Sequence, residues 1–216
     1  MLGNLMIEIL QASGETLYML IISGLLTTLL GIPLGVLLFS LQKPELLGNK
    51  RGHFILEAIV NALRSLPFVI LMIALIPVTR FLIGTAIGTT AAIVPLTIGA
   101  IPFFARIVEN ALAEVHPGLI ETGLAMGASP LQIMSKILLP EAFVSILRGT
   151  TVTLIALLGY SAMAGAIGGG GLGDLAIRYG YQRFDVKVMV ITVLVLIVLV
   201  QIIQNLGNRW VNQNEK

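Results

Sequence analysis

Long runs of residues without Asp, Glu, Lys or Arg dominate the pattern of hydrophobic and polar positions along the chain. A helix needs about 20 apolar residues to cross roughly 30 Å of hydrocarbon. One of these runs, residues 65–79, reaches that length only when it is extended back through Asn61 and Arg64. The pattern therefore predicts an all-α integral membrane protein with five transmembrane helices, spanning approximately residues 16–42, 58–79, 81–105, 149–173 and 188–208.

Arg64 is the charged residue that this extension places inside a predicted span. An Arg at the centre of the bilayer costs about 3 kcal/mol on insertion scales. Near a helix end, its long side chain can instead reach the headgroups. We therefore expect Arg64 to snorkel to the membrane surface.

The basic residues favour one orientation in the membrane. Five spans place the two termini on opposite sides, and cytoplasmic loops hold the excess of Lys and Arg. With the amino terminus outside, the cytoplasmic basic residues are Lys43, Lys50, Arg51, Arg106, Lys136, Arg148, Arg209 and Lys216, and the outer ones are Arg80, Arg178, Arg183 and Lys187. This orientation predicts a cytoplasmic carboxyl terminus and a long cytoplasmic loop, residues 106–148, between the third and fourth spans.

Composition agrees with a membrane protein. Hydrophobic residues make up 56% of the 216 positions and charged residues 11%, whereas soluble domains hold about 25% charged residues. The absence of cysteine excludes disulfides and thiolate metal sites, and a net charge of +2 gives no support to nucleic-acid binding. Residues 1–15 lack a basic leader and contain Glu8 and Glu15, so we expect a short interfacial helix there and not a cleavable signal peptide.

Several classes of function lack their usual residues. The uncharged runs contain no acid, base or histidine, and we place both histidines, His53 and His116, in solvated loops. Ion-coupled transporters usually keep ionisable groups within the bundle, and intramembrane hydrolysis needs a base to activate a serine. Gly168, Gly170 and Gly173 match G-x-G-x-x-G, but that motif indicates a dinucleotide site only between a strand and a helix.

No Walker A motif occurs in the sequence. We therefore expect no enzymatic activity, no metal site and no cofactor bound by this chain. If transport is active, another protein must supply the energy from ATP.

Prolines and glycine pairs recur in the predicted spans. The prolines are Pro33, Pro67, Pro77, Pro95 and Pro102. Neighbouring groups can satisfy the carbonyls that such prolines leave free. Alternatively, the prolines curve the helices around a cavity.

Small residues four positions apart allow close helix contact, and they occur at Gly31/Gly35, Gly84/Gly88 and Gly165/Gly169.

The predicted cytoplasmic loop contains a short helix, residues 118–128, between Pro117 and Pro130, and a second helix, residues 131–139, that we expect Pro140 to close. Apolar residues give the first helix a hydrophobic side, and they are Ile120, Leu124 and Met126. We expect this helix to have little to bury against within its own chain and hence to dock in the groove of a partner.

The loop resembles the cytoplasmic loop of permease subunits of bacterial ATP-binding-cassette importers. That family's pattern is E-A-A, three residues, G, nine residues, I, one residue and L-P. Here Glu121 and Gly127 are followed by Ile137, Leu139 and Pro140, whereas Thr122 and Gly123 replace the two alanines. The resemblance implies a coupling helix that docks on the ATPase through Glu121, Thr122, Gly123, Met126, Gly127, Ile137, Leu139 and Pro140. An amphipathic surface helix with a coincidental pattern is the alternative.

The resemblance extends over the whole chain, 1–216, as one transmembrane domain. The stretch GYSAMAGAIGGGGLGDL is similar to permeases of type I methionine importers. Membership of that family implies D- and L-methionine as substrates, the bacterial inner membrane, a homodimer, two cytoplasmic ATPase subunits that use ATP, and an extracytoplasmic methionine-binding protein. A permease for another small metabolite and a stand-alone facilitator are the alternatives.

Three residues of the fourth span precede the glycine run where such a permease would line its gate. They are Tyr160, Ser161 and Met163. Methionine is soft and adaptable, which suits a plug that changes shape. Ordinary packing is the alternative for all three.

Overall fold

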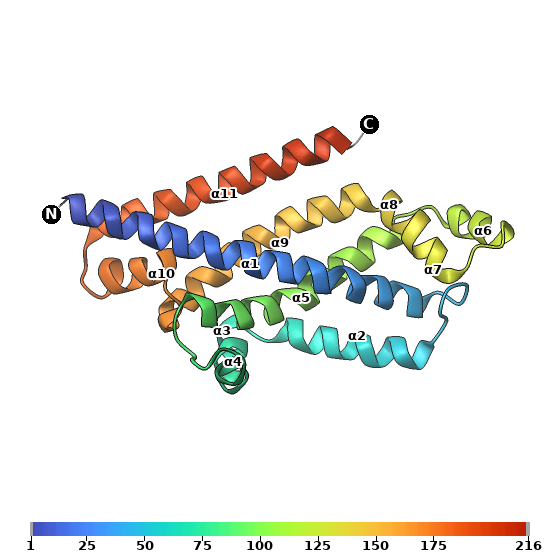
Figure 1. The fold of residues 1–216 in the computed structure, drawn as a ribbon, viewed down its shortest axis with the longest axis horizontal. Coiled ribbons are helices and arrows are strands. Elements are labelled where there is room, and N and C mark those ends of the chain that lie inside the picture. Colours follow the sequence, from blue (N-terminus) through green and yellow to red (C-terminus); the bar gives the residue numbers. More distant parts are fainter. Residues whose placement is uncertain (1, 215–216) are drawn as a thin grey trace.

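The computed structural model describes residues 2–214, which are helical over most of their length and contain no strand. Figure 1 shows an elongated bundle with the two termini toward opposite ends of its long axis. Four helices are long and apolar enough to cross a membrane, or five if one bent pair is a single span. The predicted all-α membrane fold is therefore confirmed. Lys216, one of the basic residues expected in the cytoplasm, lies outside the described residues.

The bundle is built from long helices joined by short helical pieces. The long helices are α1 (Leu2–Gln42), α2 (Lys50–Ser65), α5 (Thr89–Ala113), α9 (Phe143–Ala164) and α11 (Val186–Asn214). The shorter α-helices are α3 (Phe68–Ala74), α4 (Ile76–Ile83), α6 (Pro117–Ala125), α7 (Pro130–Ile133), α8 (Leu139–Glu141) and α10 (Gly171–Leu175). Three segments are π-helical: η1 (Met134–Leu138), η2 (Gly165–Gly169) and η3 (Ala176–Tyr181).

α1 is one continuous helix, so the short separate helix predicted for residues 1–15 is wrong. Helix α1 packs along α5 at the centre of the bundle (Figure 1). A Cβ on Gly31 would lie 2.7 Å from a ring carbon of Phe104, and one on Gly35 would lie 2.5 Å from the carbonyl oxygen of Ala105. This predicted glycine pair therefore permits the close approach of α1 to α5.

The second predicted span is broken. α2 and α3 are bent by 105° at Leu66 and Pro67. The ring of a proline disfavours helical backbone in the residue before it, and Leu66 is extended with ψ of 131°. Pro67 therefore turns the chain away from the bundle axis before it has crossed the full membrane thickness.

The third predicted span begins later than the charge pattern suggests. Phe81 belongs to α4, and the next helix, α5, begins only at Thr89. Gly84 and Gly88 lie between them with φ of 85° and 104°, a backbone region that residues with a Cβ avoid. Two left-handed glycines end one helix and precede the next, whereas the sequence prediction used only the position of Arg80.

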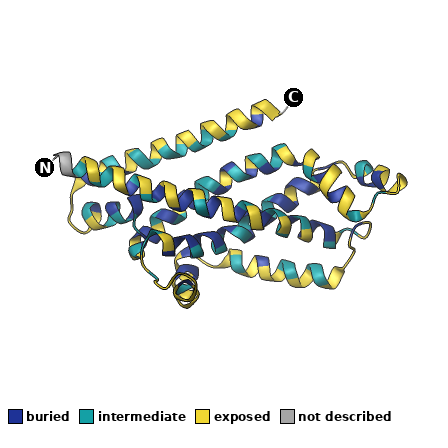
Figure 2. Ribbon diagram, in the orientation of Figure 1, coloured by how far each residue is buried: buried dark blue, intermediate teal, exposed yellow. Residues whose placement is uncertain are grey.

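Much of the apolar surface is exposed in a single chain. Figure 2 shows exposed residues along the outer faces of the long helices, most clearly on α11. Only Val188, Thr192 and Val211 of that helix are buried. Lipid tails are as apolar as these side chains, so this surface suits the bilayer or a second membrane-embedded chain.

Candidate functional site

Helix α6 begins and ends with well-formed caps at the end of the bundle opposite the amino terminus (Figure 1). At its start, the backbone N–H of Gly118 donates to a ring nitrogen of His116 over 3.1 Å. At its end, the N–H groups of Gly127 and Ala128 donate to the carbonyls of Leu124 and Gly123. This is a Schellman motif, and it fixes the direction in which the chain leaves the helix.

Gly127 is required for its backbone angle. Its φ is +78°, in the left-handed region that costs other residues about 1–2 kcal/mol. A Cβ at this position would have no other atom within 4 Å. The backbone angle, and not a lack of space, therefore favours glycine at this position.

The inner face of α6 packs against its own chain. Ile120 and Gly123 are buried, and a Cβ on Gly123 would lie 2.9 Å from Ile137 and 3.2 Å from Ile133. The expectation that this helix has little to bury against is thus wrong for this face. Gly123 and Ile137, both proposed from sequence as coupling residues, hold α6 on the helix that follows it.

The outer face of α6 is open to solvent. Glu121, Thr122 and Gly127 are exposed, and Met126 is 83% exposed. Leu131, near the start of the next helix, is 74% exposed. Two large apolar side chains and a carboxylate are thus exposed in the loop at this end of the bundle.

The next helical segment runs from Pro130 to Glu141, so Pro140 does not end it at residue 139 as predicted. Ser129 caps its start: the N–H of Gln132 donates to the Ser129 hydroxyl, and the Gln132 side chain accepts from the Ser129 N–H. The π-helical segment η1, where hydrogen bonds span one more residue, lies directly before Leu139 and Pro140. Leu139 is half-buried against the core, and Pro140 is exposed.

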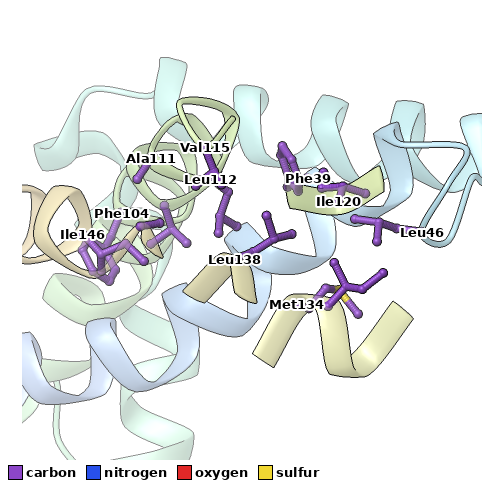
Figure 3. Close-up of a cluster of buried hydrophobic side chains, with 13 residues drawn as sticks. Phe39, Leu46, Phe104, Ala111, Leu112, Val115, Ile120, Met134, Leu138 and Ile146 are labelled. Atoms are coloured by element: carbon purple, nitrogen blue, oxygen red, sulfur yellow. The ribbon is translucent and has the colours of Figure 1, made fainter. Parts of the chain in front are cut away.

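One hydrophobic cluster joins this loop to the long helices (Figure 3). It combines side chains from the end of α1, from α5, from the loop helices and from the start of α9. Its buried members are Phe39, Leu46, Phe104, Val108, Ala111, Leu112, Val115, Ile120, Ile133, Met134, Leu138, Ala142 and Ile146. Through this cluster α6 packs against α1, α5 and the start of α9, and such packed interiors transmit strain.

The three predicted gate residues lie in different environments near the opposite end of α9. Met163 is exposed, whereas Ser161 is buried and its hydroxyl donates to the carbonyl of Leu158 over 2.8 Å. Tyr160 is half-buried and stacks on Phe68, with ring centroids 4.6 Å apart. The structure therefore does not bring the three side chains to one surface.

The glycine run after Met163 reverses the chain. Ile167 and Gly168 are non-helical inside η2, and α10 then packs back on the end of α9. A Cβ on Gly173 would lie 2.3 Å from the carbonyl oxygen of Ala162. The glycines thus serve a close helix reversal.

Helix α1 caps the start of α10. A Glu15 carboxylate oxygen accepts from the N–H of Gly171 over 2.7 Å, and the Thr16 hydroxyl accepts from the N–H of Leu172 over 2.9 Å. A carboxylate at a helix amino terminus is favourable because it satisfies free N–H groups and faces the positive end of the helix dipole. This contact, between positions far apart in the chain, was not predicted from the sequence.

A polar network that sequence reasoning missed joins α2 to α5. The Arg106 guanidinium donates to Glu109 over 2.8 Å, to Glu57 over 3.1 Å and to Asn61 over 2.9 Å. His53 lies within 3.2 Å of Glu57. The prediction of His53 as a solvated loop residue is wrong, because it is the fourth residue of α2 and its side chain is only 15% exposed.

An apolar cavity of about 220 Å³ lies between α3, α4, the start of α5 and the end of α9. Most of its wall is aliphatic, and Thr79 and Arg80 add polar groups. Its lining residues are Met72, Ile73, Ile76, Thr79, Arg80, Ala86, Ile87, Ala91, Ala92, Pro95, Ala164, Ile167 and Gly169. The described residues contain no group of acids and histidines that could hold a metal ion.

Comparison with known proteins gives consistent matches over nearly the whole chain. Residues 31–213 match the family described as "Binding-protein-dependent transport system inner membrane component". The chain is 57% identical over 205 residues to the "Probable D-methionine transport system permease protein" of Vibrio cholerae, covering 95% of this chain and 91% of that one. It is 52% identical over 151 residues to the D-methionine transport system permease protein of Escherichia coli K12, covering 70% of each.

A solved structure of the MetNI methionine ABC transporter in an inward-facing conformation matches the fold. Its TM-score is 0.95 at 47% sequence identity, and the match covers 98% of both chains. An amino acid ABC transporter at 18% identity has a TM-score of 0.80, which shows that the fold extends to distant relatives.

Proposed function

The chain belongs to the family of binding-protein-dependent transport system inner membrane components, and from this premise we propose that it is the permease subunit of an ATP-driven importer of D- and L-methionine. Two copies form the translocation pathway, two cytoplasmic ATPase subunits drive it, and an extracytoplasmic binding protein delivers the substrate. Support for methionine comes from relatives that are named as D-methionine permeases and are 57% and 52% identical.

The observation that carries the mechanism is the two-sided packing of α6. Its outer face presents Met126 and Glu121 to solvent, while its inner face is fixed to the bundle through Ile120 and Gly123. A helix with an apolar exposed side suits a hydrophobic groove on a partner. ATP-driven closure of two ATPase subunits would move two such helices, and the cluster behind them would swing α1, α5 and α9.

The residues of the coupling loop divide into two roles in this proposal. Glu121, Thr122, Met126 and Gly127 belong to the surface that meets the ATPase or shapes it. Gly123, Ile137 and Leu139 keep that surface rigid, since a mobile surface would lose displacement before it reached the bundle. Pro140 lies exposed at the end of the second loop helix.

The membrane orientation follows from where the ATPase must bind. With α6 at the cytoplasmic face, the amino terminus is outside and the carboxyl terminus is in the cytoplasm, since they lie toward opposite ends of the bundle (Figure 1). The chain spans the bacterial inner membrane, has no ATPase site of its own and binds no cofactor. ATP is consumed by the partner subunits.

Co-purification tests this function. The tagged chain should retain a cytoplasmic ATPase subunit, and methionine-loaded binding protein should stimulate ATP hydrolysis by the reconstituted complex. If another amino acid stimulated hydrolysis and methionine did not, the substrate assignment would fall while the permease assignment stood. If no ATPase were retained and the chain alone equilibrated solutes across liposomes, it would be a facilitator.

A further inference from the structure

We propose that Arg64 and Tyr160 form a subsite inside the membrane that binds the α-carboxylate of the amino acid in transit. The proposal rests on the transport function above and specifies a step within it. Its basis is an arginine that has no partner among the described residues and that lines a cavity together with a stacked pair of aromatic rings.

Arg64 lies near the end of α2 that is farther from the coupling loop. It is 14 residues after Lys50, the first residue of α2, which at 1.5 Å per residue is about 21 Å from the cytoplasmic end of that helix. The cavity next to it also touches Gly99, which is 10 residues, or about 15 Å, into α5 from the opposite end.

The cavity has a volume of about 130 Å³ and lies at the bend between α2 and α3. It is lined by Leu63, Arg64, Leu66, Phe68, Leu71, Gly99, Phe103 and Tyr160. A water molecule occupies about 30 Å³ in the liquid, so a carboxylate and a few waters fit. The stack of Phe68 on Tyr160, inclined by 10°, forms a rigid wall.

Gly99 keeps this site open on the α5 side. A Cβ there would lie 3.2 Å from the ring of Phe68 and 3.3 Å from Leu71. A residue with a Cβ would therefore require the side chains of Phe68 and Leu71 to shift.

No anion of the chain is available to Arg64. In the part of the chain that the structure describes, Arg64 makes no hydrogen bond or ion pair, whereas Arg106 and Arg178 are both paired with carboxylates. Glu57, two helical turns toward the cytoplasmic end of α2, is already bound to Arg106. An unpaired arginine at this depth is costly and marks a functional site.

We expect no free acid near Arg64 from a second copy of the chain either. On the helices that line the cavity, the acidic residues that the structure describes are Glu57 of α2 and Glu109 of α5, and both are bound to Arg106. A symmetry-related chain has the same residues at the same depths. The counter-charge therefore comes from a solute that enters the cavity.

An amino-acid carboxylate matches the donors that are present. A guanidinium donates two parallel hydrogen bonds to a carboxylate, and the phenolic hydroxyl of Tyr160, which has no hydrogen-bond partner among the described residues, can donate a third. Because D- and L-methionine share the carboxylate, this subsite admits both enantiomers.

Protection of an introduced thiol tests the subsite. The chain has no cysteine, so Leu63→Cys places a unique thiol of this chain at the cavity wall. In the nucleotide-free complex with its ATPase, in nanodiscs and without binding protein, millimolar methionine should slow maleimide labelling of this thiol several-fold. Methioninol, which has the side chain and amine but lacks the carboxylate, should not.

Variants of Arg64 identify the group responsible. Arg64→Gln should abolish the protection, and Arg64→Lys, which retains charge but loses the fork geometry, should raise the methionine concentration for half-protection about tenfold. Arg51→Gln removes a charge from the exposed start of the same helix and should leave protection unchanged. Equal protection by methioninol, or undiminished protection in a correctly assembled Arg64→Gln complex, would overturn the proposal.

Uptake by the parent transporter, in which Leu63 is unchanged, separates this proposal from the function it rests on. If the transporter imports methionine and methionine gives no protection, the subsite is wrong and the function stands. If it imports a different amino acid, that amino acid and its alcohol replace methionine and methioninol in the labelling assay. If it imports no amino acid, both proposals are wrong.

Discussion

Two glycines of the coupling loop serve different physical purposes. Gly127 adopts φ of +78° in open space, whereas Gly123 is buried and a Cβ there would press on Ile137. A substitution at the first position meets a backbone penalty, and a substitution at the second meets a packing penalty. The two should therefore respond differently to the size of the new residue.

At Gly127, the first prediction is that conformation matters more than size. Gly127→Ala should destabilise the Schellman cap by about 1 kcal/mol, and Gly127→Asn should cost less because asparagine tolerates the left-handed region. Both should still insert in the membrane, and ATPase retention on the tagged chain should fall more for alanine than for asparagine. A larger loss for asparagine would show that space, not backbone angle, limits this position.

The second prediction separates Met163 from its neighbour Ser161. Ser161 is buried with its hydroxyl bonded to the carbonyl of Leu158, so Ser161→Ala should leave methionine uptake within about twofold of the parent. Exposed Met163 is the candidate gate side chain, and Met163→Ala should raise ATP-independent leak of methionine from proteoliposomes. Equal leak for both variants would make Met163 ordinary packing.

At the scale of elements, the proposed coupling requires that the two faces of α6 be distinct. Ile120 is 6% exposed and Met126 is 83% exposed, although both were assigned to one apolar side from the sequence. The sequence showed that an amphipathic helix exists there. It could not show that Ile133 and Ile137, in the following helical segment, would fold back against Gly123.

The third prediction uses these two side chains as a matched pair. Ile120→Ala should lower the thermal stability of the purified transporter, since removing a buried isoleucine costs about 2–5 kcal/mol. Met126→Ala should leave the melting temperature unchanged but weaken ATPase binding, measured as the subunit concentration for half-maximal hydrolysis. A large loss of stability for Met126→Ala would place that side chain in the core instead.

Helix existence was predictable along this chain, and helix breaks were not. Uncharged runs identify α1, α5, α9 and α11, because a membrane requires long apolar helices. The bend at Pro67 and the left-handed Gly84 and Gly88 depend on backbone angles that hydropathy does not measure. The carboxylate of Glu15 on α10 likewise depends on a tertiary contact.

At the scale of the whole molecule, charged residues inside the bundle are either paired or exposed to a cavity. Arg106 joins α2 to α5 through Glu57 and Glu109, whereas Arg64, on the same helix as Glu57, has no such partner among the described residues. From the sequence, Arg106 was placed in a cytoplasmic loop and Glu57 lay outside every predicted span, so the network was missed. Their spacing along α2 and α5 became informative only once the two helices were known to pack together.

The fourth prediction concerns this network. Arg106→Gln leaves the carboxylate of Glu109, which is 5% exposed, without its partner, and such a loss costs about 3 kcal/mol. Glu57→Gln removes a partly exposed partner and should cost less than about 1 kcal/mol. Thermal melts of the two purified transporters should show this order, and a reversed order would mean that Glu57 is the main support of α2.

ATP-dependent accumulation of methionine in proteoliposomes tests the central claim most directly. Liposomes are prepared with this chain and its ATPase, with ATP inside and binding protein outside. They should concentrate labelled methionine above its concentration outside. Omission of ATP, of the ATPase or of this chain should each abolish the gradient. Methionine that merely equilibrated, at the same rate with and without ATP, would contradict the account.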